Sequence, residues 1–163
     1  MPGSFFDTNV LLYVASGDPA KADRAEELIG AGGMISVQVL NEIANVARRK
    51  MGLSWTETRA FLSMLRNLLP VQPLTIEIHE TGLALAERHG LSIYDAMIAA
   101  SAVHADCDTL WSEDLQDGPL LGGRLRIVNP FRPPDVIKER GQLSCLHGLA
   151  DDRRTNTAGP GQP

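Results

Sequence analysis

The chain has little cysteine, few aromatic residues and no long apolar run. Cys107 and Cys145 are its only cysteines in 163 residues, too few for a disulfide framework, and no CxxC pair occurs, so reduced thiols and a cytoplasmic location are expected. The longest candidate for a membrane span, AMIAASAV, is far shorter than the roughly 20 apolar residues that a bilayer requires. The first residues lack a basic segment, an apolar stretch and a cleavage site, so no secretory signal is expected.

An excess of positive charge is also missing. Fifteen basic residues stand against twenty acidic ones, which gives a formal net charge of −5. Strongly basic domains are typical of nucleic-acid binding, so a role of that kind would need a local basic patch or metal ions here. Arg48, Arg49 and Arg59 lie in such a patch between residues 46 and 66 and are candidate contacts to a nucleic-acid backbone. Two solvated helix faces would explain the patch equally well.

Short apolar segments alternate with amphipathic segments along most of the chain. Strands are predicted over residues 3–7, 34–36, 71–74, 109–112 and 126–128. Helices are predicted over residues 9–15, 21–29, 37–50, 54–69, 75–89 and 94–105, and Ser54 with Glu57 forms a capping-box pattern. This alternation favours an α/β domain with a mainly parallel sheet flanked by helices.

The composition changes after Phe131. Residues 132–163 are polar, contain proline and glycine, and show little periodicity. We therefore predict one domain over residues 1–131 and a C-terminal tail over residues 132–163 that is disordered or loosely attached.

Acidic residues follow two of the predicted strands. Asp7 ends the first strand, and Ser112, Glu113 and Asp114 follow the strand that contains TLW. Because ligands of open parallel sheets bind at the carboxyl ends of the strands, Asp7 and Asp114 are expected on the same edge of the sheet. A helix cap is the alternative interpretation of Asp7.

Glu42 lies at the border of the apolar face of the helix predicted over residues 37–50. Gln38, Glu42, Asn45 and Arg49 form a polar stripe along that border, which would suit the lining of a cleft. The alternative is an ordinary boundary glutamate that pairs with Arg49.

Asp95 opens the helical segment YDAMIAASAVHA, where small apolar residues share its face. A carboxylate on a buried face costs several kcal/mol unless it is paired, hydrogen-bonded or bound to a cation. A capping aspartate at the helix N-terminus is the alternative.

If these four acids converge, their mutual repulsion would favour a bound divalent cation. Oxygen ligands without histidine or cysteine suit magnesium or manganese and not zinc. The histidines at 79, 89, 104 and 147 show no paired spacing typical of metal ligands.

Three segments resemble PIN-domain ribonucleases, in particular bacterial toxins of the VapC type. They are FFDTNVLLY, VQVLNEIANV and LSIYDAMIAASAVHADCDTLWSEDLQDG, and the resemblance covers roughly residues 4–131. It implies a three-layer PIN-like fold with a mainly parallel sheet between helices. The ordered set of Asp, Glu, Asp and Asp is more specific than the DTN triplet alone.

The resemblance also implies roles for individual residues and partners. By position, Asp7, Glu42, Asp95 and Asp114 match the acidic quartet of the family, and Asp117 matches a further acidic position. Thr8, Asn9 and Ser112 match polar residues that support the acids. Such proteins bind one or two Mg²⁺ or Mn²⁺ ions, cleave RNA, form homodimers, and are blocked by a cognate antitoxin that often inserts an arginine.

Other functions fit less well. A phosphatase of the haloacid-dehalogenase type would need a second aspartate where Asn9 stands, and both it and a response-regulator receiver would need a late lysine in the domain. No GxxxxGK motif indicates an ATPase. The remaining alternative is a PIN fold that binds RNA or a partner without cleaving it.

Overall fold

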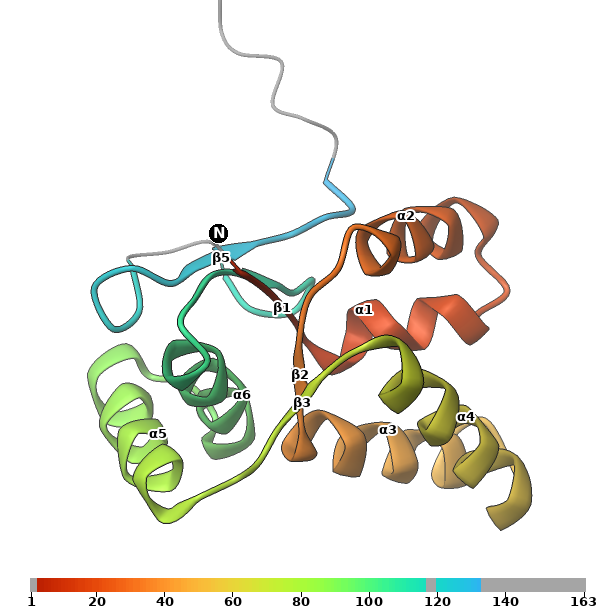
Figure 1. Cartoon of the computed structure of the whole chain (residues 1–163), viewed down its shortest axis with the longest axis horizontal. Coiled ribbons are helices and arrows are strands. Elements are labelled where there is room, and N and C mark those ends of the chain that lie inside the picture. The colour runs from red at the N-terminus through yellow and green to blue at the C-terminus, as the bar shows by residue number, and fades with distance from the viewer. Residues whose placement is uncertain (1–2, 117–119, 133–163) are drawn as a thin grey trace, which may run out of the picture. The chain divides into compact units, whose positions relative to one another are not determined.

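The computed structural model describes residues 3–116 and 120–132, which form an α/β arrangement (Figure 1). The strands are β1 (Gly3–Phe6), β2 (Ile35–Ser36), β3 (Val71–Gln72), β4 (Cys107–Trp111) and β5 (Arg126–Val128). The helices are α1 (Thr8–Leu12), α2 (Pro19–Gly30), α3 (Val37–Arg49), α4 (Trp55–Leu68), α5 (Ile76–His89) and α6 (Ile93–His104). The predicted alternation is confirmed, with ends that differ by a few residues. Asp117 and the predicted tail from residue 133 onward lie outside the described residues.

All pairings between these strands are parallel. The strands β1, β4 and β5 form one sheet in the order β1-β4-β5, and β2 pairs with β3. A parallel bridge between Phe5 and Met34 joins the two groups, because Met34 N donates to the carbonyl of Ser4 (2.9 Å) and Phe6 N donates to the carbonyl of Met34 (3.0 Å). The strands therefore follow one another in the order β3-β2-β1-β4-β5.

Helices cover both faces of the strands. In Figure 1, α5 and α6 lie on one side of β1, β2 and β3, and α1 to α4 lie on the other. Phe5 and Phe6 are both fully buried, as expected for a strand covered on both faces. Residues 96–102 of α6 are buried without interruption, which its small side chains permit. The three-layer arrangement and the mainly parallel sheet are confirmed.

Side-chain caps place two helix starts directly at strand ends. Asp7 follows β1 and accepts from Thr8 N at the start of α1, while Ser36 ends β2 and accepts from Val39 N in α3. The capping box of Ser54 and Glu57 at the start of α4 is also confirmed. Because such caps satisfy amides that have no partner within the helix, these starts are well defined, and α1 and α3 both begin at the carboxyl edge of the strands.

The helix predicted over residues 9–15 is divided. It begins at Thr8, and after Leu12 it tightens into a 3₁₀ turn, η1 (Tyr13–Ala15), which ends with a bond from Ser16 N to the carbonyl of Tyr13. Contacts of this kind are common in the last turn of a helix. None of the helices in the described part of the chain is both long and apolar enough to cross a membrane.

Gly33 allows the chain before β2 to approach β1 closely. A side chain at this position should therefore destabilise the protein. A Cβ atom at Gly33 would lie 2.4 Å from Phe6 Cε2 and 2.9 Å from the backbone oxygen of Ser4. Ser4 cannot retreat easily, because its oxygen accepts from Met34 N. We expect Gly33→Ala to lower the free energy of unfolding, measured in urea, by about 1–3 kcal/mol.

Gly30→Ala is the matched control for Gly33→Ala. Gly30 ends α2 and has no atom within 4 Å of an added Cβ, so alanine there should leave stability unchanged or raise it by up to about 1 kcal/mol. Equal stability of Gly33→Ala and the wild type would contradict the close approach of these two segments.

Candidate active site

The ends of β1 and β4 bring Asp7 and Ser112 together. Phe6 and Trp111 are register partners, and Asp7 N donates to the carbonyl of Trp111 over 3.0 Å. The next side chain on each strand then lies at the carboxyl edge. The hydroxyl of Ser112 donates to Asp7 Oδ2 over 2.6 Å. The predicted proximity of the two strand ends is thus observed.

Asp7 is a buried carboxylate, with 4% of its surface exposed. It accepts hydrogen bonds from Thr8 N on Oδ1 (2.6 Å) and from Asn9 Nδ2 on Oδ2 (3.2 Å), in addition to the bond from Ser112. Its pKa is raised to about 6: desolvation by burial is the largest cause, the bonds from Ser112 and Thr8 oppose it, and the charges of Glu42 and Asp95 add to it. Asp7 is therefore a helix cap and also part of a group of repelling carboxylates.

Glu42 reaches the same region from α3. Its Oε2 accepts from the hydroxyl of Thr8 (2.8 Å), and its Oε1 accepts from Nε2 of Gln38 (3.0 Å). The alternative pairing of Glu42 with Arg49 is wrong, since the ion pairs found within the described residues do not include it. Thr8 thereby connects Glu42 with Asp7, because the backbone of Thr8 binds one acid and its hydroxyl binds the other.

Asp95 lies in the first turn of α6. The N-cap residue Ser92 accepts from Asp95 N (3.2 Å), and its hydroxyl donates to Asp95 Oδ2 (2.7 Å). The expectation that Asp95 lies on the buried face is wrong, because its side chain is half-buried and the continuous buried stretch begins only at Ala96. The cap at this helix start is Ser92 and not Asp95, so the capping alternative is also corrected.

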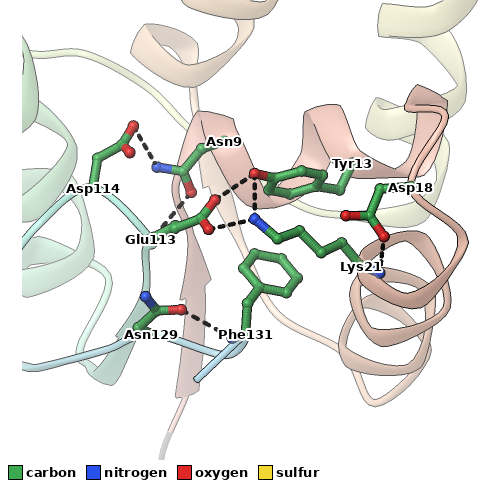
Figure 2. Close-up of polar contacts among 8 residues, drawn as sticks. All are labelled: Asn9, Tyr13, Asp18, Lys21, Glu113, Asp114, Asn129 and Phe131. Carbon is green, nitrogen blue, oxygen red and sulfur yellow. Dashed lines mark hydrogen bonds and ion pairs between the residues drawn. The ribbon is translucent and has the colours of Figure 1, made fainter. Parts of the chain in front are cut away.

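Asn9 connects Asp7 with Asp114. Its Nδ2 atom donates to Asp114 Oδ2 (3.0 Å) as well as to Asp7, and its Oδ1 accepts from Glu113 N (3.2 Å). Figure 2 shows Asn9 between Asp114 and Glu113, so the amide of Asn9 holds the turn after β4 in place. Thr8 and Asn9 thus link three of the predicted acids, Asp7, Glu42 and Asp114, through shared hydrogen bonds. Asp95 shares no such neighbour, but its charge raises the pKa of Asp7.

Two clefts meet at Ser92 and Asp95. The first, of about 450 Å³, is lined by Asp95, Asp114, His89 and Gln116 over an apolar floor that includes Leu91 and Ile127. The second, of about 550 Å³, is lined by Gln38, Asn41, Glu42, Asn45, Ser92, Tyr94 and Asp95, and we call it the amide cleft. Three members of the predicted polar stripe, Gln38, Glu42 and Asn45, line this cleft, and the fourth, Arg49, does not. Three of the four acids thus line a cleft, and Asp7 lies buried beside them.

The donor set of this region fits a hard divalent cation in its chemistry. It consists of carboxylates without histidine or cysteine. The pKa of Asp7 is raised mainly by burial and to a lesser degree by the negative charges of Glu42 and Asp95, which a cation would neutralise. As the side chains stand, however, residues 3–116 and 120–132 contain no group of three or more acidic, histidine or cysteine side chains arranged to hold a metal ion. Each of the four carboxylates instead accepts a hydrogen bond from a hydroxyl or amide donor of the protein.

Beside the acids lies a hydrogen-bond network that the sequence patterns did not predict. Lys21 Nζ donates to Glu113 Oε1 (2.5 Å) and to the hydroxyl of Tyr13 (2.8 Å), which itself donates to Glu113 Oε2 (2.5 Å) (Figure 2). The ring of Phe131 packs edge-on against Tyr13, with 4.8 Å between the ring centres. Burial would raise the pKa of Glu113, but the hydrogen bonds from Lys21 and Tyr13 outweigh it and lower that pKa. This network anchors the turn that carries Ser112 and Asp114.

In the predicted basic patch, Arg48 is engaged with other parts of the protein. The guanidinium of Arg48 donates to the carbonyl of Leu53 and lies over the ring of Trp55, 4.6 Å from its centre. Arg49 and Arg59 are exposed. Their contact with a nucleic acid stays a prediction, as do the metal-binding roles of the acids.

Comparisons with known proteins agree with this arrangement. Residues 4–116 match the family model of the PIN domain. A chain of a toxin–antitoxin complex from Klebsiella pneumoniae is 24% identical, with a TM-score of 0.61 over 80% of this chain and 100% of that one. VapC20 of Mycobacterium tuberculosis, described as a Sarcin-Ricin loop cleaving toxin, is 19% identical, with a TM-score of 0.58 over 69% and 90%.

DNA-bound VapBC from Salmonella typhimurium is 21% identical, with a TM-score of 0.61 over 80% of this chain and 99% of that one. No curated protein sequence matches the chain. The chain belongs to the PIN domain family, and VapC-type toxin complexes share its fold. The resemblance inferred from the sequence is confirmed.

The raised pKa of Asp7 predicts a specific dependence of stability on pH. The pKa is about 6 in the folded chain against an ordinary value of 3.8, so the folded state holds this proton more tightly. The contribution of Asp7 to stability is therefore full below about pH 4 and is lost as the pH rises through about 6. Between these limits we expect the wild type to lose about 3 kcal/mol relative to Asp7→Asn, as measured by urea unfolding in a chelator.

Asp23→Asn, which neutralises an exposed carboxylate of α2, is the control for Asp7→Asn and should follow the wild type at every pH. A constant stability difference between the wild type and Asp7→Asn from about pH 4 to pH 7 would contradict the raised pKa. The test is the change of the stability difference with pH and not its absolute size, because asparagine also alters the hydrogen bonds to Ser112 and Asn9.

Proposed function

We propose that the chain is a metal-dependent endoribonuclease that acts as the toxin of a toxin–antitoxin pair. The observation that carries the proposal is the buried Asp7, whose pKa is raised to about 6 at the edge of the sheet that Glu42, Asp95 and Asp114 also reach. Carboxylates that repel one another are stabilised together by a divalent cation. Membership of the PIN domain family supports a nuclease.

Asp7, Glu42, Asp95 and Asp114 would hold one or two Mg²⁺ or Mn²⁺ ions, with Asp117 proposed as a further ligand. When bound, such a cation polarises phosphate oxygens and lowers the pKa of water. Thr8, Asn9 and Ser112 would position the carboxylates, since each of them donates to at least one acid. Substitution of such supporting residues typically lowers metal affinity or activity by about 10- to 100-fold.

The reaction would be hydrolysis of an RNA phosphodiester bond. Water adds across the bond between phosphorus and the 3′ oxygen, which leaves a 5′-phosphate on one product and a 3′-hydroxyl on the other. The two clefts that meet at Asp95 would hold the chain on either side of the cut. Bound cations would offset the formal charge of −5, and Arg49, Arg59 and the partly engaged Arg48 would contact the backbone.

The proposed partners follow from the structural relatives. The similar chain from Klebsiella pneumoniae belongs to a toxin–antitoxin complex, and the one from Salmonella typhimurium is VapBC bound to DNA. We propose that a cognate antitoxin covers the acids of this chain, with an arginine that binds carboxylates through its planar fork of donors. A homodimer is proposed on the resemblance to VapC-type toxins.

A second candidate is a PIN fold that binds RNA or a partner without cutting. It is favoured by the finding that no group of acids in the described part of the chain is arranged to hold a metal ion. The carboxylates are instead engaged with protein donors such as Ser92 and Gln38. Ligand residues alone do not establish turnover, so the two candidates differ only in their activity.

Cleavage of RNA by the purified chain separates the two candidates. We expect Mg²⁺ or Mn²⁺ to support cutting of total RNA, a chelator to abolish it, and sequenced products to carry 5′-phosphates. Asp95→Asn should lower the rate more than about 100-fold, because it removes a charge from the site and not only a supporting contact. Asp23→Asn, which removes an exposed carboxylate of α2 that lines neither cleft, should cut like the wild type. Equal rates for the wild type and Asp95→Asn would show that the assigned site is wrong.

Growth of bacteria that express the chain tests the toxin role. Without an antitoxin, the wild type should arrest growth, and Asp7→Asn should relieve the arrest because it removes the central carboxylate. Colony counts and optical density after induction measure the effect, and immunoblots of the soluble fraction check that both proteins reach the same level. Unrestricted growth with abundant soluble wild type would contradict the toxin role while leaving nuclease activity open to the cleavage assay.

A further inference from the structure

The amide cleft is lined by side chains that have no role in the proposed group of acids. Asn41 and Asn45 come from α3, and Tyr94 comes from the first turn of α6, next to Asp95. The two acids of this cleft, Glu42 and Asp95, belong to the proposed catalytic group. A molecule that reaches those acids from this side therefore lies against Asn41, Asn45 and Tyr94.

Tyr94 is an exposed aromatic residue, with 66% of its surface accessible. Within the described part of the chain, neither its hydroxyl nor its ring has a hydrogen-bond or ring partner. By contrast, Tyr13 is held by Glu113, Lys21 and Phe131. An open aromatic face beside a carboxylate site offers a stacking surface, and stacking of one base on such a ring contributes about 1–3 kcal/mol.

Asn41 and Asn45 lie one helical turn apart, so they share a face of α3. Both are exposed, and among the described residues neither amide has a hydrogen-bond partner. Gln38 differs, because it is buried and donates to Glu42. An asparagine side chain presents a donor and an acceptor together, which is the pattern that the edges of nucleobases complement.

The lining of the amide cleft includes no lysine or arginine among the described residues. Phosphate groups are therefore poor candidates for what Asn41, Asn45 and Tyr94 contact. A flat aromatic ring with neutral amides suits a base and not a backbone. Bases expose their faces and edges in this way only when they are unpaired, which points to a single strand or a loop.

We propose that the amide cleft binds one unpaired nucleotide next to the scissile phosphate, with its base stacked on Tyr94 and its edge bonded to Asn41 and Asn45. The cleft would then select the base beside the cut and exclude duplex RNA. This inference rests on the proposed ribonuclease function, and it names the form of the substrate and the residues that determine sequence preference.

Binding in a chelator tests the inference without cleavage. Fluorescence anisotropy would compare labelled single-stranded RNA of random sequence with the same length of duplex. The wild type should bind the single strand more tightly, Tyr94→Ala should weaken that binding about 5- to 150-fold, and Tyr94→Phe should restore it. Ile76→Ala is the control and should bind like the wild type, because Ile76 is an exposed apolar residue in the first turn of a helix, 71% accessible on α5.

Mapped cleavage ends supply the second measurement. With metal present, Asn41→Ala and Asn45→Ala should change the distribution of bases beside the cut, while Asn67→Ala, an exposed asparagine on α4, should leave it unchanged. Tyr94→Ala should raise KM more than it lowers kcat, since the ring contacts a base and not the reacting atoms.

The outcomes distinguish this inference from the proposed function. A wild type that cuts RNA, together with a Tyr94→Ala variant of equal binding and unchanged base distribution, overturns the inference and leaves the ribonuclease intact. Equal binding of duplex and single strand, or no binding of either, also overturns it. A wild type that binds single strands through Tyr94 in the chelator but never cuts with metal supports the inference and overturns the ribonuclease.

Discussion

The hydrogen bond from Ser112 to the buried carboxylate of Asp7 is the contact on which the site depends. It joins the ends of β1 and β4, and the bonds from Thr8 N and Asn9 complete the surroundings of the same carboxylate. Desolvation of an ionised acid is costly, and these donors offset only part of it. The remainder is visible in the pKa of about 6, to which Glu42 and Asp95 add their own charges.

The packing of the surrounding strands and helices offsets the free-energy cost of burying Asp7. The bridge of Phe5 and Met34 and the parallel pairing of β1 with β4 hold the strand ends, while the buried stretch of α6 fixes the turn on which Asp95 lies. The network of Lys21, Tyr13 and Glu113 holds the turn after β4 from the other side. Sites of function are often less stable than their surroundings, and here the least favourable charges coincide with the candidate site.

Local patterns in the sequence predicted most of the fold and the position of Asp7 and Asp114. Strand ends in a parallel sheet share an edge, so these two acids could be placed without the structure. The exposure of Asp95 could not be predicted, because the limit of the buried stretch depends on how α6 packs against its neighbours. Besides Gln38 on its own helix, Glu42 is bonded by Thr8, 34 residues away, and Glu113 bonds to Tyr13 across 100 residues. Pairs so distant leave no periodic signal, so the choice of Arg49 for Glu42 was wrong and the network of Lys21 was missed.

The length of chain between the two halves of the site also bears on how the protein is made. Asp7 is synthesised well before Ser112 and Asp114, which contact Asp7 and Asn9 across 105 residues. A nascent chain on the ribosome therefore has no complete group of acids until β4 and the turn after it have been translated. If the proposed activity holds, the growing polypeptide stays harmless to the RNA around it for most of its own synthesis.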